Sequence, residues 1–123
     1  MANVTQIEKR VRMDNWDIVK YQILTHCYLQ KIIMSEADLD CLTFLAVLGE
    51  VELTNFCTKA ADRKIFQSPQ TVRNALNKAE TKNLITKEGK SKKRISIHPD
   101  LKLQTQGNIL LDYKFLALET AKN

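Results

Sequence analysis

The chain has 123 residues, of which 44% are hydrophobic, and its formal net charge is +5. This length suits one domain, or one domain with an appended arm, and is sufficient for a hydrophobic core. The sequence contains no run of about eighteen apolar residues, and its polar, charged start does not resemble a secretory signal. We therefore expect a cytoplasmic protein with no membrane partner.

Residues 1–13 are predicted to form a polar N-terminal arm, and residues 14–34 to form the first element. In this element Tyr21, Leu24 and Tyr28 recur at helical spacing, although Val19, Tyr21 and Ile23 would also fit the alternation of a strand. A stretch of twenty residues, 14–33, without Gly or Pro favours a helix over a strand. This helix is a candidate for oligomerisation.

Two further helices follow. Ser35 is placed to cap the first of them, and Gly49 is placed to end it. The stretch ELTNFCTKAADRKIF, residues 52–66, predicts a shorter helix. Thr54 is the expected cap of this helix, and Phe56 is expected to face inward.

Ser68 and Pro69 are favourable residues for the start of another helix, because serine caps orphan amides and proline fits the first helical position. The buried stripe of this helix is predicted to be Val72, Leu76 and Ala79. The opposite face is polar. It carries Gln70, Arg73, Asn74, Asn77 and Thr81.

The remaining residues favour strands. Residues 84–86 and 94–98 predict a hairpin whose tip spans 88–94, and Pro99 ends it. Leu101, Leu103 and Thr105 alternate, as do apolar residues within 109–115, so 99–123 predicts a second hairpin. A final helix through 110–118 is the alternative. Both faces of that last segment are apolar, so this chain or a neighbour must cover it.

Positive charge is concentrated in one part of the chain. Residues 59–94 carry eleven Lys or Arg against three acidic residues, a net +8, whereas the remainder carries eight basic and eleven acidic residues, a net −3. One face of the molecule should therefore attract a polyanion.

The order helix, helix, capped helix and basic hairpin over residues 35–98 resembles a winged helix-turn-helix. The stretch SPQTVRN at 68–74, with Leu76 and the sequence NLI at 83–85, resembles the recognition helix and first wing strand of bacterial or phage regulators of that family, including MarR-like ones. The expected fold is α+β: a winged helix-turn-helix with an extra N-terminal helix and a C-terminal β-hairpin. Family members usually have a glycine before the capped serine. Phe66 stands there instead, which predicts a longer turn or a different angle between the helices.

The resemblance implies that double-stranded DNA is the partner, and that the protein is most simply a dimeric transcriptional regulator. The recognition helix would present Ser68, Gln70, Thr71, Arg73, Asn74, Asn77 and Lys78 to the major groove. The wing would place Lys87, Lys90, Lys92, Lys93 and Arg94 along the backbone or minor groove. Arg, Asn and Gln can pair with base edges, and lysines supply affinity independent of sequence.

An alternative function is that of a non-enzymatic winged-helix subunit in a larger assembly, such as a phage virion structural component or a replication complex. The fold would then dock protein, through copies of itself or other subunits, and the protein could lie in a virion. The apolar C-terminal segment, 109–118, lacks an obvious cover and keeps this alternative open.

The three cysteines, Cys27, Cys41 and Cys57, lie far apart and lack metal-binding spacing. Core packing as reduced thiols is the expected role of all three. The sequence has no Gly-rich phosphate loop, no metal-spaced ligand set and no nucleophile elbow. We therefore expect neither an enzyme nor a metal or cofactor site.

Overall fold

The computed structural model describes residues 14–90 and 93–104. The predicted N-terminal arm, Lys92 and residues 105–123 lie outside these ranges. The described elements, in chain order, are α1 (Asn15–Leu29), α2 (Glu36–Leu48), β1 (Val51–Glu52), α3 (Leu53–Asp62), α4 (Pro69–Thr81), β2 (Ile85–Glu88), β3 (Arg94–Ile97) and the 3-10 helix η1 (Pro99–Leu101). The α+β class and the N-terminal helix are confirmed.

The strands form one antiparallel sheet in the order β1–β3–β2. β2 and β3 are the predicted hairpin, with Ile85 opposite Ile97 and Glu88 opposite Arg94. Strand β1 was not predicted. It pairs Val51 with Ile95 on the other edge of β3, and a strand of two residues is too short to show an alternating pattern.

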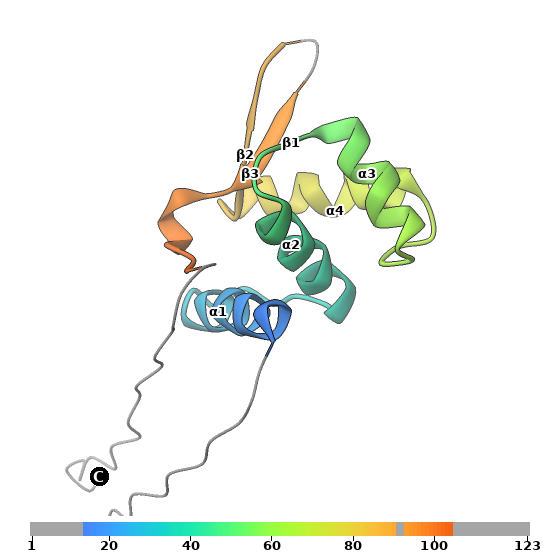
Figure 1. The fold of residues 1–123 in the computed structure, drawn as a ribbon. Helices are drawn as coiled ribbons and strands as arrows, with labels where there is room; N and C mark the ends of the chain where they lie inside the picture. The colour runs from blue at the N-terminus through green and yellow to red at the C-terminus, as the bar shows by residue number, and fades with distance from the viewer. Residues whose placement is uncertain (1–13, 91–92, 105–123) are drawn as a thin grey trace, which may run out of the picture.

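The helices surround a single core, with α1 lying across α2 on one side and α3 and α4 packed together on the other (Figure 1). The hairpin projects from the end of the molecule opposite α1. Phe56, Leu76 and Ile95 are fully buried at the centre. The rings of Phe44 and Phe56 lie 5.5 Å apart, and that contact joins α2 to α3.

Two of the three predicted helix N-caps are confirmed. Ser35 and Ser68 are both N-caps whose side chains accept amide hydrogen bonds. The prediction for Thr54 is wrong, because α3 begins at Leu53 with Glu52 as its N-cap and no side-chain cap bond. The Leu53 amide donates to the Lys93 carbonyl at 2.8 Å. The sheet therefore fixes where this helix starts.

Three helices end in the same backbone motif without glycine. Lys31, Lys64 and Asn83 have φ of 58°, 61° and 59°. In each case the next residue's amide donates back to the carbonyl of the third-last residue of the helix, as from Ile65 to Ala60 at 3.1 Å. This is the Schellman motif, in which glycine is preferred. In the turn before Ser68 the residue with positive φ is Lys64 and not Phe66, and Phe66 packs against the core.

After β3 the chain departs from the predicted second hairpin. Residues 99–101 form η1, in which the His98 side chain accepts a hydrogen bond from the Asp100 amide. Leu101 is buried, and Lys102 turns the chain with a φ of 48°. Pro99 favours the first position of a helix. Leu101, the one buried residue here, reaches the core from η1 and does not require a strand. The strand prediction is therefore wrong for 99–104, none of which lies in a strand, and the rest of that hairpin, residues 105–123, lies outside the described residues.

Candidate nucleic-acid interface

The start of α3, the middle of α4 and the hairpin meet around an open hollow of about 370 Å³. Its lining residues come from segments far apart in the sequence. They are Glu52, Leu53, Thr54, Arg73, Asn77, Lys87 and Lys93. Three of these seven are cations and one is an acid, so the hollow has an excess of positive charge.

Lys87 joins β2 to α4 at one wall of the hollow. Its Nζ donates to Asn77 Oδ1 at 2.5 Å and lies 3.5 Å from Glu80 Oε1. Only 11% of the Lys87 side chain is exposed. This lysine therefore fixes the hairpin relative to α4, and its ammonium group is only partly available to a ligand.

Arg73 projects from α4 into the same hollow and is half-buried. Burial raises the pKa of the Cys57 thiol, whereas the positive charges of Arg73 and Lys87 lower it. Both cations therefore lie close to the α3 thiol, from two different elements. No described acidic side chain forms an ion pair with Arg73.

The α3 end of the hollow adds peptide groups to these cations. Because the Glu52 side chain makes no cap bond, the first amides of α3 have no side-chain acceptor. Amides at a helix N-terminus attract anions. The cations of α4 and the hairpin thus face the positive end of α3, and a phosphate oxygen is the type of group that such a hollow accommodates.

The outward face of α4 is polar and preorganised by bonds within the helix. The Ser68 hydroxyl caps the Thr71 amide at 3.3 Å and contacts the Thr71 hydroxyl at 2.9 Å. Gln70 Nε2 donates to Asn74 Oδ1 at 3.0 Å. Gln70, Asn74 and Asn77 are all exposed. Donors and acceptors for base edges are present, but the Gln70–Asn74 pair must open to use its bonded atoms.

The hairpin cations have different surroundings. Lys90 and Lys93 are exposed, while Arg94 Nε donates to Glu50 Oε1 at 2.5 Å. Both side chains of that pair are more than half exposed, so exchange of Glu50 for another anion costs little. The structure therefore brings Lys87 and Lys93 to the hollow and places Lys90 and Arg94 elsewhere on the hairpin.

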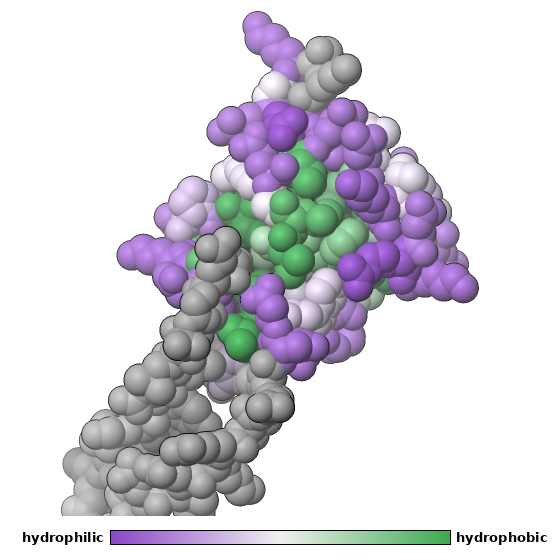
Figure 2. Space-filling model, viewed as in Figure 1, coloured by the Kyte–Doolittle hydropathy of each residue, from purple (hydrophilic) through white to green (hydrophobic). Residues whose placement is uncertain are grey.

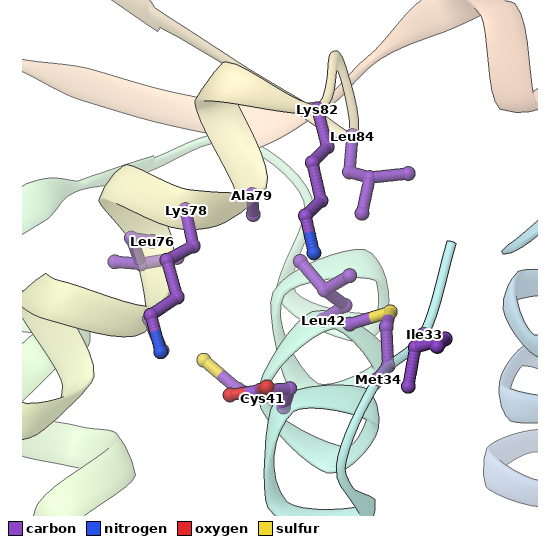
Figure 3. Close-up of a pocket in the computed structure, with 11 residues that line it drawn as sticks. Ile33, Met34, Cys41, Leu42, Leu76, Lys78, Ala79, Lys82 and Leu84 are labelled. Carbon is purple, nitrogen blue, oxygen red and sulfur yellow. The ribbon is translucent and has the colours of Figure 1, made fainter. Parts of the chain in front are cut away.

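Lys78 does not lie with the other predicted residues. It lines a separate cavity of about 20 Å³ between α2 and the end of α4, together with Cys41 and Lys82. Figure 3 shows Lys78 and Lys82 extending from α4 toward α2. That volume is about the size of one water molecule. The cavity therefore cannot hold a larger ligand.

All three cysteines are buried, as predicted. Desolvation by burial raises the pKa of the Cys41 thiol to about 12, and burial also raises the pKa of the Cys27 thiol. Thiols in this state are poor nucleophiles at neutral pH.

Sequence reasoning missed the part of the hollow that α3 supplies. Glu52, Leu53 and Thr54 reach it only because β1 pairs with β3, a contact between residues 51–52 and 94–95. A two-residue strand gives no sequence signal. Glu50, the partner of Arg94, was missed for the same reason.

Within residues 14–90 and 93–104, no helix has the length and apolar character needed to cross a bilayer. In the same ranges, His, Cys, Asp and Glu side chains form no group of three or more that could hold a metal ion. Comparison with protein-family models, with curated proteins and with solved structures gives no match.

Proposed function

We propose that this protein is a duplex DNA-binding protein with a winged helix-turn-helix fold. In this assignment α3 and α4 are the helix-turn-helix, α4 is the recognition helix, and the β2–β3 hairpin is the wing. The observation that carries the proposal is the hollow in which Arg73 of α4 and Lys93 of the hairpin meet. Helix and hairpin thus present their positive charge to the same space.

In the proposed complex α4 enters the major groove. Arg73 donates to guanine or to an adjacent phosphate, and Asn74 and Gln70 pair with base edges once their mutual bond opens. Lys90 and Lys93 follow the phosphate backbone, where they release counterions and add affinity for any sequence. A transcriptional regulator that acts as a dimer is the simplest protein of this kind, since two copies read two half-sites.

The test is a series of duplex-binding measurements at increasing salt, on random and genomic fragments. We expect affinity to fall steeply with salt, and Lys93→Ala to reduce the slope of log K against log [salt] by about 0.9 for its one phosphate contact. Arg73→Ala should also reduce the preference among sequences.

Lys82→Ala is the matched control, because it removes one charge from the C-terminal end of α4 without altering the hollow. The positive charge of Lys82 lowers the pKa of Cys27 in α1, which places it on the α1 side of the molecule. Lys82→Ala should bind like the parent. If Lys93→Ala and Arg73→Ala also bind like the parent, or if the parent shows no salt-dependent binding, the proposal is wrong.

A second candidate function is that of a non-enzymatic subunit that docks protein in a larger assembly. Figure 2 shows an apolar patch over α2, surrounded by hydrophilic residues. Val47 and Leu48 of α2 are 44% and 37% exposed, and three residues of α1 are at least 49% exposed. Weak DNA binding together with stable oligomers in sedimentation would favour this candidate over the first.

A further inference from the structure

The outer face of α1 is apolar, although nothing in the described ranges covers it. Val19, Ile23 and Cys27 face the core. On the other side, Leu24, Tyr28 and Leu29 are 49%, 80% and 70% exposed. Large apolar side chains that are exposed close together typically mark an interaction site. This face therefore needs a partner.

The end of the described chain, Gln104, is hydrogen-bonded to Gln22 at the edge of that face. The Gln104 amide donates to Gln22 Oε1 at 2.8 Å, and Gln22 Nε2 donates to the Gln104 carbonyl at 2.9 Å. These paired bonds join residues 82 positions apart. Figure 1 shows η1 close to α1. Gln22 and Leu29 are seven residues apart, so both lie on one side of the helix, about 10 Å from each other.

The segment that follows Gln104 is apolar enough to cover this face of α1. Of the ten residues 109–118, seven are large and apolar. They are Ile109, Leu110, Leu111, Tyr113, Phe115, Leu116 and Leu118. The four residues between, 105–108, include Gly107 and can span roughly 13 Å when extended. The apolar segment can therefore reach Leu29 from its attachment at Gln22.

We propose that residues 109–118 of the same chain dock on the outer face of α1. A connection of only four residues gives an effective concentration in the millimolar range. A second copy of the protein at micromolar concentration is at a disadvantage of roughly a thousandfold for the same site. Under this proposal residues 14–34 contact another part of their own chain, whereas the sequence suggested a role in oligomerisation. Any dimer of the proposed regulator then forms through another surface.

Hydrogen exchange on the full-length protein, measured at several concentrations with sedimentation in parallel, tests this proposal. Amides of residues 109–118 should be protected in a monomer, to the same degree at every concentration. Leu29→Arg places a charge in the docking face, and it should accelerate exchange of 109–118 at least tenfold without altering exchange in α2–α4.

Val47→Arg is the control, since it puts the same charge on an exposed apolar site of α2, 44% exposed against 70% for Leu29, and it should leave exchange of 109–118 unchanged. Protection that rises with concentration together with dimer formation would assign the face to a second copy and overturn the proposal. Unprotected amides in the parent, or no response to Leu29→Arg, would overturn it as well. None of these outcomes depends on whether the protein binds DNA.

Discussion

The first prediction concerns the substitution Lys87→Met, which removes the side-chain hydrogen bond between β2 and α4. Methionine keeps most of the aliphatic stem and therefore leaves no large cavity, but it removes the ammonium group that contacts Asn77 at 2.5 Å and Glu80 at 3.5 Å. A hydrogen bond to a charged group contributes about 1.5–3 kcal/mol. The pair with Glu80, whose side chain is 46% exposed, adds between about 0 and 1 kcal/mol.

We expect Lys87→Met to lower the free energy of unfolding by about 1.5–2 kcal/mol, because the gain from no longer burying a charge offsets part of the loss. With a urea dependence of about 2 kcal/mol per molar, the midpoint shifts down by roughly 0.8–1 M. Urea unfolding followed by the fluorescence of Trp16, the only tryptophan, measures this shift.

A double-mutant cycle with Asn77→Ala separates the bond from other effects of either substitution. If Lys87 acts through Asn77, the two losses are not additive, and the coupling is about 1 kcal/mol or more. A loss below about 0.5 kcal/mol, which is typical of an exposed surface site, or additive losses would refute the reasoning.

Three other predictions concern single sites. Lys64→Gly should stabilise the protein by about 0.5–1 kcal/mol in thermal unfolding, because glycine adopts the left-handed conformation of the α3 terminus without strain. Stability should fall as pH rises above 9, by up to about 1.4 kcal/mol per pH unit for Cys41, because its pKa is near 12 in the folded chain and the unfolded thiol ionises first. Cys41→Ala should reduce this pH dependence of stability. A smaller dependence should remain, because burial also raises the pKa of Cys27 and Cys57. Glu50→Gln should release Arg94 and raise the affinity for duplex DNA by up to about fivefold, the equivalent of an exposed ion pair, whereas an unchanged affinity would show that Arg94 makes no phosphate contact.

Local signals in the sequence were sufficient for much of the fold. A serine before a proline marked the start of α4, and the spacing of Val72, Leu76 and Ala79 identified its buried side. These features depend on a few neighbouring residues. Caps and apolar stripes can therefore be found from sequence alone.

Features set by distant residues could not be predicted. The start of α3 depends on a backbone bond from Leu53 to Lys93, and residue types near Leu53 do not reveal it. The tie between Lys87 and Asn77, and the position of Lys78 beside α2, likewise depend on packing between elements. The α4 and hairpin residues of the candidate site were thus named from the sequence, while the α3 residues of the hollow, the bonded state of Lys87 and the separate position of Lys78 needed coordinates.

The strand order β1–β3–β2 also constrains how the chain can fold. β3 is the last of the described strands and the middle one in the sheet, so β1 has no partner until residues 94–95 are available. The α3–α4 pair is local, but closing the sheet brings together residues 44 positions apart, as in Val51 and Ile95. Such closure is slow relative to helix pairing. During synthesis on the ribosome, the helices can therefore assemble early, and the hollow between α3, α4 and the hairpin is completed only when the hairpin emerges.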